Sequence, residues 1–249
     1  AFLQLFDELA KGSSSSQTKA FNDVHNPVSE AALAPVFSPR TNLTDLKHYI
    51  DIVKSAKRSL LFCTAFDLHD DLEAALLGEN GGRILRYGLQ NTKSRITGYH
   101  REKTADFVAT AFLRKGLEGF LRETLAGQRG RLLVHTKVIL TDFDSNEPVL
   151  VTGSSNFSSS SSKSNDENAV VIRGNTQVAD IYACEIMRLY THYRFRHKLA
   201  QKVKRAKDSA PPPRPSLSTT DEWTKKYFEL GTLPAIEREQ FSRPAVPAT

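Results

Sequence analysis

Hydrophobic positions in the first part of the chain switch between strand and helix spacing. Residues 34–40 form a short apolar run, and residues 42–56 place apolar side chains on one helical face. The nearly continuous apolar run of residues 59–66 is typical of a strand covered on both faces. Residues 68–77 return to helical spacing, and residues 83–90 read as another strand. This order predicts an α/β layered domain with a mixed, largely parallel central sheet.

The second part of the chain continues the pattern with one weaker stretch. Residues 107–113 are predicted as a strand or a buried helix, and residues 117–125 as a helix. From Arg131 onward, two apolar runs are separated by turn residues, which predicts a hairpin. Residues 168–173 form one more predicted strand, and residues 177–207 a long helix with a basic end. The cations at that end either complement the helix dipole or bind an anion.

The ends of the chain differ from this regular middle. Residues 1–12 have helical spacing, and their octet FLQLFDEL resembles IMRLYTHY of the long helix, which suggests the closing helix of a possible preceding domain. Residues 13–33 begin with a serine-rich stretch and are predicted to be a flexible linker. The main α/β domain is expected over residues 34–207. Residues 208–249 are expected to be a proline-rich, aromatic tail that packs on it.

Composition narrows the class of protein. No run of eighteen apolar residues exists, so no membrane-spanning helix is predicted. The net charge of +6 favours anionic partners, although a basic surface without a specific partner is an equal alternative. Cys63 and Cys184 lie in apolar surroundings and are predicted to be buried free thiols. The chain opens without an initiator Met or a signal pattern, so the natural start is expected upstream and the compartment stays open.

Candidate chemistry is concentrated around the predicted hairpin. His135 and Lys137 stand two residues apart in an extended run, so both side chains are expected on one face. A histidine that only packs in the core needs no lysine on the same face of the strand. The presence of Lys137 beside His135 therefore favours a functional site. The complete set of ordered residues is His135, Lys137, Asp142, Gly153, Ser154, Asn156 and Glu167.

The pattern His-x-Lys-x4-Asp, followed by Gly-Ser-x-Asn and Asn-Asp-Glu, resembles the signature of the phospholipase D superfamily. The segment GSSNFSSSSSKSNDEN is similar to the corresponding segment of the family's small nucleases. The wider resemblance runs over residues 34–199 and implies a layered α/β/α domain. Ten residues separate Asp142 from Gly153, which is more than the common pattern has, and a longer hairpin turn would absorb them.

Each of these residue types suits phosphodiester cleavage. An imidazole can attack phosphorus to form a phosphohistidine, or donate and accept the proton of the leaving oxygen, and His135 can take either role. Lys137, Asn156 and the Ser154 hydroxyl are expected to bind the nonbridging oxygens. The resemblance assigns Glu167 to orienting His135, and gives Asp142 and Gly153 structural roles. It implies no metal and no cofactor.

The chain carries one such set, whereas the superfamily's active site needs two. The other six histidines lack a partner lysine two residues on: His25, His48, His69, His100, His192 and His197. The second half-site is therefore expected from an N-terminal tandem domain or from a homodimer mate.

The predicted activity is that of a phosphoric diester hydrolase acting on a phospholipid or a nucleic acid. One alternative is transfer (transphosphatidylation), in which an alcohol replaces water. Another is a non-catalytic nucleic-acid-binding protein whose second half is degenerate.

Overall fold

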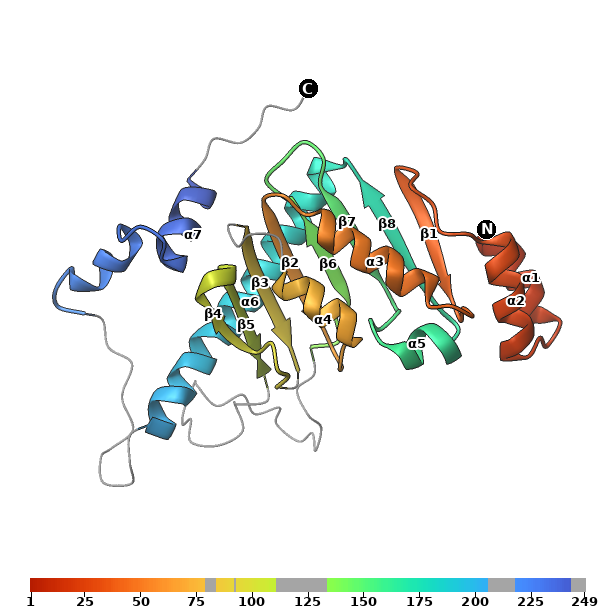
Figure 1. Ribbon diagram of the computed structural model, residues 1–249, viewed down its shortest axis with the longest axis horizontal. Helices are drawn as coiled ribbons and strands as arrows, with labels where there is room; N and C mark the ends of the chain where they lie inside the picture. The colour runs from red at the N-terminus through yellow and green to blue at the C-terminus, as the bar shows by residue number, and fades with distance from the viewer. Residues whose placement is uncertain (79–83, 92, 111–133, 206–217, 243–249) are drawn as a thin grey trace.

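One eight-stranded sheet organises the structure (Figure 1). The computed structural model describes residues 1–78, 84–91, 93–110, 134–205 and 218–242, with side chains omitted for residues 199–205. The strands are β1 (Leu33–Ser38), β2 (Ser59–Thr64), β3 (Leu85–Gln90), β4 (Gly98–His100), β5 (Ala105–Ala109), β6 (Val138–Thr141), β7 (Val149–Gly153) and β8 (Glu167–Arg173). Their order across the sheet is β1-β8-β7-β6-β2-β3-β5-β4.

The sheet is mixed, and its parallel part is small. Among the described strands, β2–β3 and β3–β5 pair in parallel, and every other pair is antiparallel. The prediction of an α/β domain with a mixed sheet is confirmed, but the sheet is not largely parallel. Parallel pairing is confined to the neighbours β2, β3 and β5, whereas β6, β7 and β8 pair with one another in chain order as antiparallel strands and β6 joins them to β2.

Helices cover both faces of this sheet. They are α1 (Phe2–Ala10), α2 (Ser15–His25), α3 (Thr44–Ser55), α4 (Asp70–Leu77), α5 (Ser159–Ser164), α6 (Thr176–Arg205) and α7 (Leu233–Phe241), with short 3-10 segments η1 (Arg101–Lys103) and η4 (Glu222–Tyr227). Figure 1 shows α3 and α4 on one face and α6 behind the other, while α1 and α2 lie beyond β1. None of the helices in the described part of the chain has the length and apolar character of a membrane crossing.

Two hydrophobic clusters lie on opposite faces of the sheet. In β2, Leu60 and Phe62 join the cluster under α3 and α4, while Leu61 and Cys63 join the cluster under α6. This alternation explains why β2 is buried at every position and apolar at its four central ones. Cys63 is buried as predicted, but Cys184 is exposed. Position 184 falls on the outer face of α6, because neighbouring helical residues point about 100° apart.

The predicted linker after residue 12 is largely helical. Ser14 caps α2: its side chain accepts a hydrogen bond from the Gln17 backbone, and the Gln17 side chain accepts one from the Ser14 backbone. At the far end of α2, the buried Asn22 donates to the Pro39 carbonyl at 3.3 Å. The serine run reads as flexible in composition, yet one of its serines starts a helix that packs on the domain.

Two further differences concern the middle of the chain. The stretch predicted as a strand or buried helix contributes β5, which begins two residues earlier than expected. The helix predicted over residues 117–125 lies outside the described residues.

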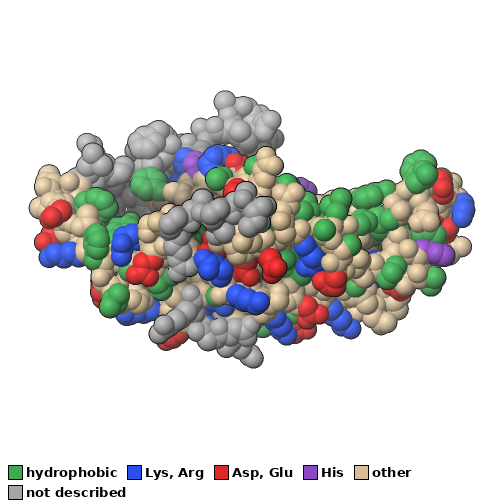
Figure 2. Space-filling view, turned by 90° about the horizontal axis from the view of Figure 1, so that it is seen from above, with side chains coloured by type: hydrophobic (Ala, Val, Ile, Leu, Met, Phe, Trp, Pro, Cys, Tyr) green, Lys and Arg blue, Asp and Glu red, His purple; other side chains and the backbone are tan. Residues whose placement is uncertain are grey.

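On the face shown in Figure 2, acidic and basic side chains are interspersed along the molecule, so the positive charge does not form a single patch there.

Candidate functional site

Strand direction brings the candidate residues to one edge of the sheet. β6 runs antiparallel to β2 and β7, and β8 runs antiparallel to β7. The carboxyl ends of β2 and β7 therefore meet the amino ends of β6 and β8. Phe66, His135, Asn156 and Glu167 follow or precede these strand ends, so all four lie at this edge, which we call the His135 edge.

His135 and Lys137 lie in the extended segment just before β6 rather than inside it. Both contact the ring of Phe66: the His135 ring meets it edge to face at 5.8 Å, and Lys137 Nζ lies 5.9 Å from its centre. Lys137 is 4% exposed and donates to the His135 carbonyl at 2.9 Å, whereas His135 is exposed. Burial lowers the pKa of Lys137, and the negative charge of Glu167 partly opposes this. The edge thus holds an exposed imidazole beside a largely desolvated amine.

Asn91 fixes the segment that carries His135. Its Nδ2 donates to the carbonyls of Val134 and Ala65 at 2.7 and 2.9 Å, and its Oδ1 accepts from the Val134 backbone at 2.7 Å. A buried amide thereby ties the residue before His135 to the residue before Phe66. The sequence prediction did not include Asn91. The available signal was a polar residue directly after a fully buried strand.

Gly153 permits β7 and β8 to approach closely where the site begins. A Cβ at this position would lie 2.3 Å from the Asn168 carbonyl oxygen and 2.5 Å from the Ala169 Cα. The Ser154 backbone then donates to Asn168 at 2.8 Å, and the Ser154 hydroxyl accepts from the Asn168 backbone at 3.1 Å. The hydroxyl also donates to the Asn168 carbonyl at 3.3 Å, so it extends the β7–β8 ladder. Its contact with phosphate stays a prediction.

Glu167 organises the loop that carries Asn156. Its carboxylate accepts hydrogen bonds from the Asn156 backbone at 3.0 Å, from Ser161 Oγ at 3.0 Å and from Asn165 Nδ2 at 2.9 Å. These are its hydrogen-bond partners within the described residues, and His135 is not among them. The carboxylate that the resemblance assigns to orienting His135 is thus engaged with the neighbouring loop.

The serine run that follows Asn156 forms the short helix α5, although its composition is typical of a loop. Ser158 caps α5 by accepting from the Ser161 backbone. Ser161 Oγ reaches Glu167, while Ser162 Oγ donates to the buried carboxylate of Asp45 on α3. The small serine side chains allow α5 to pack against the end of the sheet. Their hydroxyls hold Glu167 and join α5 to α3 through Asp45.

Asp142 lies at the opposite end of β6 from His135. Its carboxylate accepts from three successive backbone N–H groups, those of Lys57 at 3.0 Å, Arg58 at 2.7 Å and Ser59 at 3.1 Å. Asp142 therefore holds the turn that leads from α3 into β2. This position separates it from the four residues at the His135 edge.

Comparison with protein families decides the relationship. The family described as cardiolipin synthase, PLD-like domain matches residues 49–190, which is more than half of the chain. The chain belongs to the phospholipase D-like family. The match includes His135, Lys137, Asn156 and Glu167, so the phospholipase D-like segment contains the whole His135 edge.

Several solved structures are similar to this phospholipase D-like chain. Nuc from Salmonella typhimurium is 17% identical with a TM-score of 0.47, over 65% of this chain and 95% of Nuc. NucT from Helicobacter pylori is 14% identical with a TM-score of 0.46, over 65% and 96%. Phosphatidylserine synthase from Haemophilus influenzae Rd KW20 is 11% identical with a TM-score of 0.42, over 77% and 52%. No curated protein matches the chain in sequence.

The phospholipase D-like site has supporting residues that the motif does not contain. Phe66 contacts both motif side chains, Asn91 fixes their backbone and Ser161 fixes Glu167. Only Ser161 stands inside a recognisable motif segment, and there its serine-rich context concealed its role. Over the residues that the structure describes, no cluster of three or more His, Cys, Asp or Glu side chains could hold a metal ion.

Proposed function

We propose that this chain supplies one half-site of a phosphodiesterase. The observation that carries the proposal is the set of interactions that links the motif residues at the His135 edge. Phe66 contacts both His135 and Lys137. The charge of Glu167 raises the pKa of Lys137 against the effect of burial, and the Glu167 carboxylate accepts a hydrogen bond from the Asn156 backbone. A nucleophilic imidazole, a cation and an amide next to one another suit a tetrahedral phosphate.

The proposed reaction divides two tasks between two histidines. One neutral imidazole attacks phosphorus, the bond to the leaving oxygen breaks and a phosphohistidine forms. The second histidine donates a proton to the leaving oxygen and then accepts one from water, which attacks phosphorus and releases the first histidine. His135 takes one of these roles. Its exposure supports this, because an imidazole that is covered by its own chain cannot reach phosphorus.

Lys137 and Asn156 stabilise the charge that develops on the nonbridging oxygens. Lys137 is largely removed from water, which strengthens its interaction with an anion. A preorganised donor of this kind contributes about 3 kcal/mol to transition-state stabilisation. For Asn156 the donor to phosphate is Nδ2. Its Oδ1 is buried and has no hydrogen-bond partner among the described residues, so this acceptor is left for a donor from elsewhere.

The second half-site comes from an N-terminal tandem domain or from a homodimer mate. Support comes from the sequence, in which His135 is the single histidine with a lysine two residues on. Two copies of the His135 edge facing each other, or one facing a related domain, bring two histidines to one phosphate. The substrate class is a phosphodiester, carried by a phospholipid or by a nucleic acid.

A cleavage assay with two substrates tests the proposal. Wild type and His135→Ala are incubated with a single-stranded oligonucleotide and, separately, with phospholipid vesicles, and His25→Ala serves as a control for loss of an exposed histidine. We expect cleavage of one substrate, and a loss on the order of a thousandfold or more in His135→Ala alone. Undiminished cleavage by His135→Ala would remove the proposed mechanism.

The same assay separates hydrolysis from transfer. A primary alcohol added to the reaction competes with water for the phosphohistidine. For the proposed hydrolase we expect the water product to remain dominant. An alcohol-exchanged product in its place would identify a transferase that uses the same half-site.

A further inference from the structure

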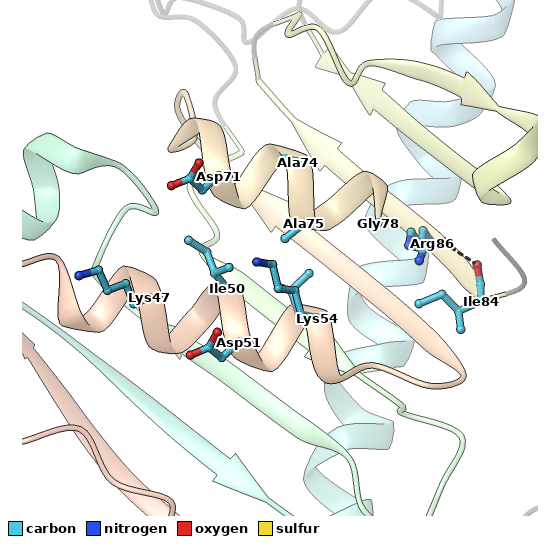
Figure 3. Close-up of a pocket in the computed structure, with 11 residues that line it drawn as sticks. Lys47, Ile50, Asp51, Lys54, Asp71, Ala74, Ala75, Gly78, Ile84 and Arg86 are labelled. Atoms are coloured by element: carbon cyan, nitrogen blue, oxygen red, sulfur yellow. Dashed lines mark hydrogen bonds between the residues drawn. The ribbon is translucent and has the colours of Figure 1, made fainter. Parts of the chain in front are cut away.

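A pocket of about 560 Å³ lies between α3 and α4, away from the His135 edge (Figure 3). Its lining includes Lys47 and Lys54 from α3, Gly78 at the end of α4 and Arg86 near the start of β3. β3 runs parallel to β2, whose carboxyl end forms part of the His135 edge. Arg86 therefore lies toward the opposite end of the strands, and the pocket is separate from the proposed catalytic half-site.

Arg86 is a buried cation without an anionic partner among the residues that the structure describes. It is 1% exposed, and its Nη1 donates to the carbonyls of Lys103 at 2.7 Å and Ile84 at 3.4 Å. Its Nε is buried and has no hydrogen-bond partner in the described part of the chain. Burial lowers the pKa of Arg86 to about 10, and no charge on a described residue opposes this. A buried, uncompensated charge is unfavourable, so this arrangement calls for a counter-ion.

Gly78 packs closely against the side of the guanidinium that lacks acceptors. A Cβ at position 78 would lie 2.5 Å from Arg86 Nη2 and 3.4 Å from Arg86 Nε. Any larger residue would therefore collide with the guanidinium, and the positive φ of Gly78 also favours glycine. The Nε–Nη2 side of a guanidinium is a planar pair of donors that matches two oxygens of an oxyanion.

The rim of the pocket has no net charge, so it leaves the charge of Arg86 uncancelled. The two lysines, Lys47 and Lys54, are matched by two aspartates, Asp51 and Asp71. The net positive charge of the pocket lining therefore comes from the Arg86 guanidinium at one end of the pocket. Figure 3 shows the two lysine side chains along α3 and Arg86 beyond Gly78. We propose that this groove binds a phosphate group, free or carried by a small phosphorylated molecule, with Arg86 as the main contact and the lysines at its rim.

Phosphate-dependent stabilisation tests this site. Thermal unfolding is followed in inorganic phosphate and in chloride at matched ionic strength, and the apparent Kd is measured by titration calorimetry. A parallel titration with glycerol phosphate distinguishes the free from the carried phosphate group. The variants are Arg86→Gln and the double variant Lys47→Gln/Lys54→Gln, with Lys57→Gln outside the lining as a control that matches the single charge change of Arg86→Gln. Lys137→Ala removes binding at the His135 edge.

We expect phosphate to raise the Tm of wild type, Lys57→Gln and Lys137→Ala alike. In Arg86→Gln and in the lysine pair, the shift is lost or the apparent Kd rises by about tenfold or more. The proposal would be overturned if phosphate raised the Tm of both pocket variants as much as that of the wild type. It would also be overturned if Lys137→Ala lost the shift. If Arg86→Gln does not fold, the exposed lysine pair decides the result. Neither outcome depends on the cleavage assay.

Discussion

Phe66 is the side chain that joins the two motif residues of the half-site. Its ring packs against the His135 imidazole and lies beneath the Lys137 amine, yet the side chain is 46% exposed. A half-exposed ring contributes little to the core and much to the direction in which its neighbours point. Phe66 is therefore a positioning residue for the proposed chemistry.

We expect Phe66→Leu to lower kcat by about tenfold while KM and the Tm change little, because the ring orients His135 more than it supports the fold. Steady-state kinetics and thermal unfolding on the same samples measure both effects. Phe241→Leu is the matched control, since Phe241 is 47% exposed and stacks on Phe143, at the opposite end of β6 from His135. A fall in kcat of equal size in the control would contradict the assignment.

The two cysteines differ in their surroundings and should differ in reactivity. Burial raises the pKa of the Cys63 thiol to about 12, whereas Cys184 is exposed on α6. Because the thiolate is the reactive form, we expect a thiol reagent to modify Cys184 in the native protein and Cys63 only after unfolding. Mass spectrometry of labelled peptides with and without denaturant measures this. Labelling of Cys63 in the native state would show that β2 opens.

A buried histidine links α3, β8 and the segment before β1. His48 Nδ1 lies 3.4 Å from Glu30, and Arg173 on β8 approaches His48 Nε2 at 3.3 Å while pairing with Glu30 at 2.6 Å. Burial lowers the pKa of His48, and Arg173 adds to the effect while Glu30 opposes it. The neutral imidazole suits the place between Glu30 and Arg173, because a proton on Nε2 would point at the Arg173 guanidinium.

This link predicts a loss of stability in mild acid. The unfolded chain takes up a proton on this histidine near its usual pKa of about 6.5, while the folded protein resists protonation to lower pH. The free energy of unfolding should therefore fall as the pH drops below that value, and His48→Gln should remove this part of the fall. Urea unfolding above and below the usual pKa measures it, with the exposed His25→Gln as control. An identical fall in wild type and His48→Gln would exclude His48 as the cause.

The C-terminal segment is held to the domain by few but well-buried contacts. Leu233 of α7 is 3% exposed within the cluster under α6, and Glu237 accepts from Arg194 at 3.4 Å. Arg194 in turn lies 3.2 Å from Asp106 at the end of the sheet. Residues of α7 thus extend the second hydrophobic layer, and the division of the chain into a domain and a packed tail stays a prediction.

Two leucines three residues apart test this packing. We expect Leu233→Ala to lower the free energy of unfolding by roughly 2–5 kcal/mol, because it leaves a cavity in the cluster. Leu230→Ala should change it by less than about 0.5 kcal/mol, since Leu230 is 85% exposed. Chemical denaturation measures both. Equal effects of the two substitutions would mean that α7 does not contribute to the folded core.

Elements with strong periodicity were predictable from local sequence. The apolar run of β2, the amphipathic pattern of α3 and the long helix α6 are all present near their expected bounds. The short β4 and the helix α5 were not predicted. Their residues are held by pairing with β5 and by hydrogen bonds to Glu167 and Asp45, and local composition does not report such partners.

The sequence by itself determined the family pattern, the α/β character and the spacing that brings His135 and Lys137 to one aromatic ring. These follow from short-range periodicity, which a residue's own neighbours fix. The tertiary structure alone decided that Asn91 clamps the His135 segment, that Glu167 binds the Asn156 loop, and that Arg86 lies buried with no anionic partner among the described residues. Each of these depends on segments brought together by the strand order, and on burial that removes water as a competing partner.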